Sequence, residues 1–140
     1  MTYEIKENTL TEKDFNRLRV SAGWGKLSEK QGEEALKNSL LTIAVMDEGQ
    51  VIGMGRLVGD GVCICYVQDL VTLPQYQGKG IGKAIMERLI AYAKEHGIPE
   101  THLTLGLFAA KGKEAFYQKL GFSTRPNEKR GPGMELSLEL

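Results

Sequence analysis

The residues best able to do chemistry lie in one glycine-rich segment, Gln77-Gly78-Lys79-Gly80-Ile81-Gly82-Lys83. An apolar run, residues 66–73, precedes the three alternating glycines, and a helical pattern, residues 83–96, follows them. Glycine has no Cβ, so a ligand can come close to the main chain. The first N–H groups of a helix lack intrahelical partners, and the helix dipole is positive there. With two lysine charges added, the segment predicts an anion site, most simply for a phosphate group.

Two well-known nucleotide-binding patterns do not fit this segment. A P-loop requires G-x-x-x-x-G-K followed by Ser or Thr, but the interval from Gly78 to Gly82 is too short and Ala84 follows Lys83. A dinucleotide fingerprint requires G-x-G-x-x-G early in a βαβ unit. Here the glycines have a different spacing and lie in mid-chain. The anion is therefore predicted to belong to another kind of ligand.

The segment fits a third pattern, Q-x-x-G-x-G, which begins at Gln77. Through this pattern and its context, residues 66–82, the chain resembles the GNAT superfamily of acyl-CoA N-acyltransferases. A second block, residues 114–122, resembles the "A-x-x-F-Y-x-x-x-G-F" helix end of that family. A weaker match at residues 51–56 resembles its "G-x-x-R" third strand. The order and spacing of the blocks make the likeness specific from about residue 41 onward.

The resemblance implies an α/β fold with a central, mostly antiparallel twisted sheet of six to seven strands, splayed at strands 4 and 5 and flanked by about four helices. We expect one N-acetyltransferase domain over residues 1–140. Local patterns agree with a mixed order of strands and helices. Thr11 and Ser28 are expected to cap two N-terminal helices. The further expected helices are 83–96 and 111–120, and the expected strands are 3–7, 41–46, 51–58, 62–73, 102–107 and 134–140.

In the resembled fold, acetyl-CoA binds where the sheet splays. Its pantetheine arm would lie beside the main chain of Leu70, Val71 and Thr72 like an added strand. Main-chain donors there would stabilise the oxyanion of the tetrahedral intermediate. The diphosphate would bind the glycine loop, which consists of Gln77, Gly78, Lys79, Gly80, Ile81, Gly82 and Lys83.

Tyr117 is the candidate general acid that the resemblance implies. The leaving thiolate should have a conjugate pKa of about 8.5, by analogy with cysteine, and an ordinary tyrosine has one of about 10. A positioned phenol can therefore protonate the leaving group. No good general base lies on the active face of the long strand, so we expect a water chain that involves Asp69 or Asp60. Alternation places Asp69 on the opposite face unless a β-bulge turns it.

Acceptor specificity is expected to come from the N-terminal helices and from loops near the thioester. The candidate acceptor-pocket residues are Trp24, Arg56, Asp60, Tyr66, Gln68 and Phe108. Core packing explains a single tryptophan equally well. Ala110 stands where many relatives carry an asparagine that contacts the cofactor. The acceptor class stays open among small amines, amino acids, polyamines and protein amines.

Composition limits the remaining choices. The net formal charge is zero, which gives no bulk electrostatic reason to expect nucleic acid or membrane partners. We also expect no metal, no signal peptide and a cytoplasmic location. The leading interpretation is an N-acetyltransferase that moves an acetyl group from acetyl-CoA to a small-molecule or peptide amine by direct attack in a ternary complex. The alternative is a catalytically weak acyl-CoA-binding sensor, and the edge of the last strand suggests a homodimer.

Overall fold

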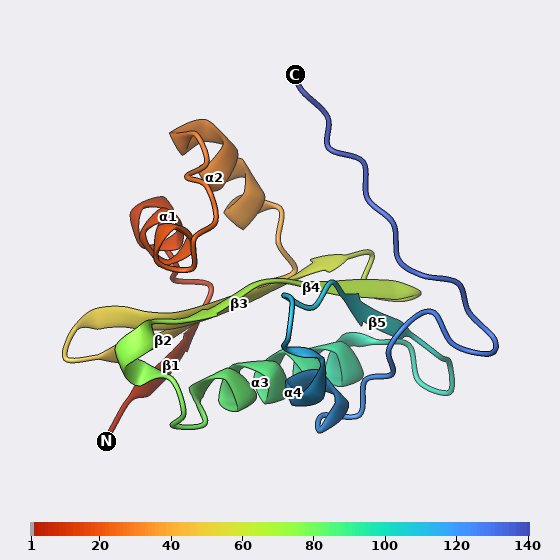
Figure 1. Cartoon of the computed structure of the whole chain (residues 1–140). Helices are drawn as coiled ribbons and strands as arrows, with labels where there is room; N and C mark the ends of the chain where they lie inside the picture. The colour runs from red at the N-terminus through yellow and green to blue at the C-terminus, as the bar shows by residue number, and fades with distance from the viewer. Residues whose placement is uncertain (1) are drawn as a thin grey trace. The chain divides into compact units, whose positions relative to one another are not determined.

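The computed structural model describes residues 2–140, which fall into two compact units, one ending at Leu107 and the other spanning Phe108–Leu140. The first unit contains a five-stranded sheet in the order β1-β2-β3-β4-β5 (Figure 1). Only the β4–β5 pair is parallel. The mixed α/β class is confirmed, although the described residues form five strands and not six to seven. The strands are β1 (Glu4–Glu7), β2 (Leu41–Asp47), β3 (Gln50–Gly59), β4 (Ile64–Thr72) and β5 (Thr104–Leu107).

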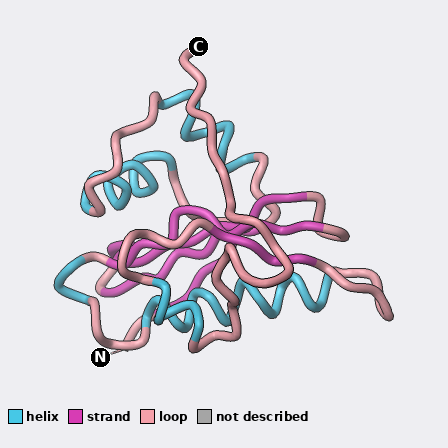
Figure 2. Tube along the Cα trace, turned by 45° about the vertical axis from the view of Figure 1, so that its right-hand side comes forward, coloured by secondary structure: helices cyan, strands magenta, loops and turns pink. Residues whose placement is uncertain are grey.

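Helices cover both faces of this sheet. Helices α1 (Glu12–Ser21) and α2 (Glu29–Lys37) lie on one face, and α3 (Ile81–His96) lies on the other (Figures 1 and 2). The two predicted caps are confirmed, because the hydroxyls of Thr11 and Ser28 accept hydrogen bonds from main-chain N–H groups in the first turns of α1 and α2. The buried side chains of α3, including Ile85 and Leu89, form an apolar core with the sheet.

Strands β4 and β5 pair over only part of their length. Their register runs from Ile64 opposite Thr104 to Val67 opposite Leu107. Beyond that point β4 continues through Gln68 to Thr72, where β3 is its only partner in the described sheet. The predicted splay between strands 4 and 5 therefore leaves an open edge on the last five residues of β4.

The second unit contains one short helix, α4 (Glu114–Gln118). The rings of Phe116 and Phe122 each meet the ring of Tyr117 edge to face, with centroids 5.0 and 6.0 Å apart. The N–H of Phe122 donates to the carbonyl of Tyr117 at 3.1 Å, which closes the helix end. The predicted helix over 111–120 is thus shorter than expected.

The strand predicted at residues 134–140 is absent from the structure. The apolar members of this alternating segment are all at least 69% exposed: Met134, Leu136, Leu138 and Leu140. A strand requires a neighbour for its main-chain hydrogen bonds, and alternation of side chains does not supply one. The predicted strand is therefore wrong for this segment, which pairs with no strand of the described chain.

Candidate cofactor and acceptor site

The glycine loop enters α3 through two residues in the left-handed region. Gly78 has φ +76° and Gly80 has φ +81°, and a Cβ built on either would meet no atom within 4 Å. These positions therefore need glycine for its backbone conformation and not to avoid a clash within the protein. Gly80 precedes the helix with no side-chain cap. The loop thus leads into a helix start that no side chain shields.

The N–H groups at the start of α3 are available to a ligand. The N–H of Ala84 donates to the carbonyl of Gly80 at 3.0 Å. The N–H groups of Ile81, Gly82 and Lys83 precede it and have no carbonyl one turn behind them. Lys79 and Lys83 are exposed beside them. Three oriented N–H groups and two cations fit a diphosphate better than a single phosphate.

Two side-chain contacts anchor the loop to the sheet. Nε2 of Gln77 donates to the carbonyl of Thr72 at 3.1 Å, which connects the loop to the end of β4. The hydroxyl of Tyr76 donates to Oδ2 of Asp47 at 2.8 Å, and this hydrogen bond raises the pKa of Tyr76. The side chain of Gln77 therefore holds the loop in place.

The open edge of β4 presents main-chain donors. The N–H of Leu73 donates to the carbonyl of Ile52 on β3 at 2.9 Å. Because N–H groups alternate along a strand, the N–H of Val71 also faces β3, and those of Leu70 and Thr72 face the open edge. Leu70 and Thr72 therefore supply the donors that a strand-like ligand would need.

A β-bulge sits immediately before these donors. Arg56 pairs with Gln68 and Met54 pairs with Val71, so Gly55 of β3 lies opposite both Asp69 and Leu70. Asp69 has φ +56°, a conformation that few residues other than glycine, asparagine and aspartate adopt. The bulge turns Asp69 toward the face of α1 and α2, so strict alternation does not hold at this position.

The carboxylate of Asp69 is bound by two arginines. Oδ1 accepts from Nη1 of Arg19 at 2.5 Å, and Oδ2 accepts from Nε of Arg56 at 2.8 Å. The carboxylate is 1% exposed, and the two arginine side chains are 15% and 14% exposed. Both oxygens of this buried carboxylate are therefore occupied by guanidinium donors. We call Asp69, Arg19 and Arg56 the ion triad.

The predicted acceptor residues divide into several groups. Arg56 and Gln68 pair across neighbouring strands, and they face the same side of the sheet as Thr42, under α1 and α2. Trp24 is half-buried, and its ring lies 5.7 Å from the guanidinium carbon of Arg19. Tyr66 also faces this side, because it pairs with Val58.

Asp60 has a structural task in the turn before β4. Its Oδ1 accepts hydrogen bonds from the N–H groups of Val62, Cys63 and Ile64 at 2.8–3.0 Å, and these bonds lower its pKa. The strand therefore begins at Ile64 and not at Val62 as predicted. A carboxylate of lowered pKa is a weak base, so we give Asp60 no part in proton transfer.

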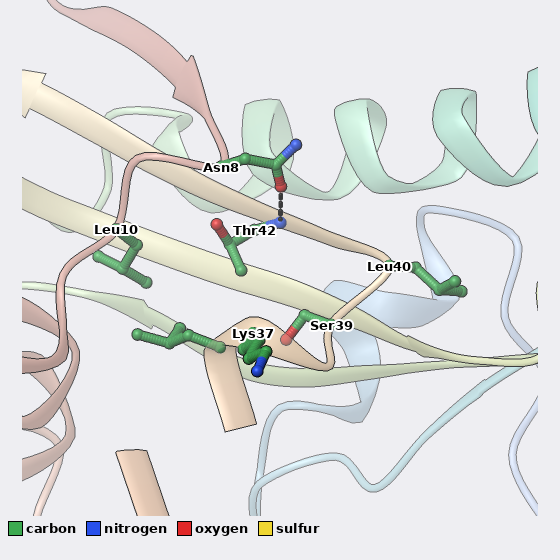
Figure 3. A pocket seen from close by; sticks show the side chains of 7 residues that line it. Asn8, Leu10, Lys37, Ser39, Leu40 and Thr42 are labelled. Atoms are coloured by element: carbon green, nitrogen blue, oxygen red, sulfur yellow. Dashed lines mark hydrogen bonds between the residues drawn. The ribbon is translucent and has the colours of Figure 1, made fainter. Parts of the chain in front are cut away.

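A separate pocket of about 390 Å³ lies beside the C-terminal end of α2 (Figure 3). None of the predicted acceptor residues lines it. Its wall includes Ser39 and Thr42, and the N–H of Thr42 donates to Oδ1 of Asn8 at 3.1 Å. Ser39 also accepts a hydrogen bond from Nη1 of Arg56 at 3.3 Å. The pocket therefore borders the ion triad, whereas β4 with its open edge lies two strands from Thr42, about 10 Å away.

Two residues of α1 that the sequence does not single out, Arg19 and Asn16, hold structure on this side of the sheet. No local pattern marks Arg19, because its partner Asp69 is 50 positions away. Asn16 is 2% exposed, and its amide holds Leu27 through hydrogen bonds to both the N–H and the carbonyl. A polar residue within an apolar helix pattern is the available signal for Asn16, since a buried amide needs hydrogen-bond partners.

This chain is similar to known acetyltransferases. A family model described as an acetyltransferase (GNAT) domain matches residues 38–124, more than half of the chain. An uncharacterized N-acetyltransferase ycf52-like protein of Prochlorococcus marinus is 32% identical over 87% of this chain and 68% of its own length. A rice protein named serotonin N-acetyltransferase 2, chloroplastic, is also 32% identical, over 84% of this chain and 58% of its own.

Solved structures extend the likeness to nearly the whole fold. A probable acetyltransferase from methicillin-resistant Staphylococcus aureus has a TM-score of 0.86 and 30% identity, and it covers 98% of this chain and 100% of its own. A GNAT family acetyltransferase from Streptococcus pneumoniae has a TM-score of 0.81 and 28% identity, and it covers 99% and 100%.

Proposed function

Because the chain belongs to the GNAT family of acetyltransferases, we propose that it moves an acetyl group from acetyl-CoA to a primary amine by direct attack in a ternary complex. One observation carries the proposal. The open edge of β4 ends beside a glycine loop whose helix start has unshielded N–H groups. This arrangement suits a ligand that combines an extended amide chain with a diphosphate.

Different groups of the protein would bind the two parts of coenzyme A. The N–H groups from Gly78 to Lys83, with the lysine charges, would bind the diphosphate. The amide-containing pantetheine arm would lie along Leu70 to Thr72 as an added strand. The hydrogen bond from Gln77 to Thr72 connects these two binding regions. The thioester would then lie near the bulge.

The transfer itself needs little covalent chemistry from the protein. The amine nitrogen attacks the thioester carbon, and the oxyanion that forms accepts a hydrogen bond from an open-edge N–H such as that of Leu70. Comparable donors lower barriers by about 3–4 kcal/mol. The C–S bond then breaks, and we assign Tyr117 as the donor of the proton that the leaving thiolate takes up. This role rests on the sequence motif and on the match between the acidity of a phenol and that of the leaving thiol.

The amine must lose a proton before it attacks. Asp69 is the base, acting through water, that is expected from the sequence. Both of its oxygens are engaged by guanidinium groups, so we propose that solvent water takes the proton and that Asp69 does not.

A small-molecule or peptide amine is the proposed acceptor. The name of the rice relative specifies serotonin, a primary amine, for that protein. We propose that Trp24, Arg56, Tyr66 and Gln68 contribute to the acceptor site. A cytoplasmic location stays a prediction, since the name of the rice relative specifies the chloroplast for that protein. Within residues 2–140 no helix is long and apolar enough to cross a membrane.

A thiol-release screen over amines, amino acids, polyamines and peptides tests the function. Release of free coenzyme A with one amine class, in proportion to the acetylated product, is the expected result. Calorimetry with acetyl-CoA runs alongside it. Binding without turnover for every amine would favour the second candidate, an acyl-CoA sensor, which the alanine at position 110 also favours. No binding at millimolar acetyl-CoA would refute both.

We also propose that the chain forms a homodimer through residues 134–140. The exposed apolar side chains of this segment have no sheet partner within the described chain, and we propose that it forms a strand by pairing with the same segment of a second copy.

A further inference from the structure

The ion triad lies at the junction of four elements, and its role goes beyond filling space. Arg19 belongs to α1, Arg56 to β3 and Asp69 to β4. Nη1 of Arg56 also donates to the carbonyl of Ala35 on α2, at 3.4 Å. A single buried carboxylate therefore connects the two helices over the acceptor side to the strand that is proposed to bind the thioester.

The arginines of the triad are themselves held in place. Both guanidinium carbons lie over the ring of Phe15, at 5.9 Å for Arg19 and 5.6 Å for Arg56. Nε of Arg19 donates to the carbonyl of Gly25 at 3.3 Å. A planar guanidinium that is fixed at several atoms leaves the carboxylate one position to occupy. The triad is thus a rigid clamp and not a mobile surface pair.

The clamp acts on the main chain of β4. Asp69 is the residue of the bulge that adopts φ +56°, and its carboxylate must point toward α1 for the two pairs to form. One extra residue in a strand reverses which N–H groups face each side for the rest of that strand. The bulge therefore decides that the N–H groups of Leu70 and Thr72, and not that of Val71, face the open edge.

The opposite side of the bulge is equally constrained. A Cβ at Gly55, which lies across from Asp69 and Leu70, would come within 2.7 Å of Cγ2 of Ile85 on α3. The strand cannot relax toward α3 without displacing that core. The bulge is held between the ion triad on one face and the helix on the other.

We propose that Asp69 is a positioning residue: clamped by Arg19 and Arg56, it fixes the bulge that aims the N–H of Leu70 at the acetyl carbonyl of the thioester. This inference rests on the proposed function. It assigns Asp69 no proton transfer, and it makes Arg19 and Arg56 part of catalytic alignment and not only part of the acceptor side.

The test compares Asp69→Asn with the wild type. Asparagine keeps the size of the side chain and tolerates the left-handed conformation, but it removes the charge that holds two guanidinium groups. We expect kcat to fall on the order of 10²-fold, the loss that misplacement by about 1 Å can cause. The dissociation constant for free coenzyme A should change less than about threefold, because the substitution leaves the glycine loop, which is proposed to bind the diphosphate, unchanged.

A spectroscopic readout separates positioning from a structural role. The infrared band of an isotope-labelled thioester carbonyl should shift to lower frequency when acetyl-CoA binds the wild type, and this shift should be smaller in Asp69→Asn. The matched control is Glu7→Gln, which breaks the exposed pair between Glu7 and Arg88, 3.3 Å apart, and should leave kcat and the carbonyl band unchanged. If Asp69→Asn unfolds, Arg19→Lys keeps the charge and should show the same changes with smaller amplitude.

The possible outcomes are distinct. An unchanged carbonyl shift in a folded variant would overturn the proposal. A second result would also overturn it. If Asp69→Asn lost kcat but kept the shift of the carbonyl band, and its plot of kcat against pH no longer fell on the acidic side, Asp69 would be identified as the base. If the wild type itself bound no acetyl-CoA, the proposed function would fail before the role of Asp69 was reached.

Discussion

Replacing Gly80 with alanine should weaken acetyl-CoA binding far more than it weakens the fold. Gly80 has φ +81°, and no atom of the protein lies within 4 Å of a Cβ built there. The added methyl group would therefore lie in open space, next to the N–H groups that are proposed to bind the diphosphate. The only penalty within the protein itself is that of a left-handed alanine, about 1–2 kcal/mol.

The structure offers a matched control for this change. Gly49, in the turn between β2 and β3, has φ +78° and likewise has no atom within 4 Å of its built Cβ. Gly49→Ala should carry the same backbone penalty at a distance from the loop. Both variants should therefore lose about 3–10 °C in Tm, which is the range that 1–2 kcal/mol produces in a chain of this size.

Only Gly80→Ala should lose affinity. A hydrogen bond to a charged group contributes about 1.5–3 kcal/mol, so the loss of one N–H contact to the diphosphate should raise the Kd for acetyl-CoA about tenfold to 100-fold. Isothermal calorimetry measures the Kd, and a thermal melt measures the shared stability loss. Equal Kd values in the two variants, with equal losses in Tm, would refute the assignment of this loop to the diphosphate.

Three further predictions follow from other parts of the molecule. Tyr117→Phe should keep the Kd for acetyl-CoA and lose most of kcat in a thiol-release assay, and an unchanged kcat would remove Tyr117 from the mechanism. Asp60 has a lowered pKa, so its contribution to stability is present above the unfolded pKa of about 3.9 and is lost as the pH falls through the folded value. Asp60→Asn should therefore lower Tm at neutral pH and flatten the acid side of a Tm-against-pH curve, whereas a parallel curve would contradict the turn assignment. Leu136→Asp with Leu138→Asp should convert a dimer to a monomer in light scattering, and a wild type that is already monomeric would refute the dimer.

The loop and its flanking elements could be predicted from the sequence because their signals are local. Thr11 and Ser28 cap helices within three residues of their own positions. The alternating glycines correctly marked the turn into α3, since Gly78 and Gly80 adopt the left-handed conformation that glycine favours. Each of these features depends on residues that are neighbours in the chain.

The bulge and the last segment could not be predicted in the same way, because their structure depends on distant partners. Asp69 takes its conformation beside Arg19 and Arg56, which are 50 and 13 positions away. No local pattern identifies these partners. The alternation at residues 134–140 predicts which side chains share a face, but pairing needs a second strand, and periodicity does not say which strand that is.

The two halves of the proposed site are held by different physical means, and this separates binding from alignment. Backbone dihedral preference and neutral hydrogen bonds, such as that of Gln77 to Thr72, maintain the glycine loop. Buried ion pairs maintain the bulge of β4. Removing one member of a buried pair leaves an uncompensated charge, so damage to the triad should move the Leu70 donor while the loop keeps its shape. Changes in the loop should therefore act on the affinity for coenzyme A, and changes in the triad should act on the rate of acetyl transfer.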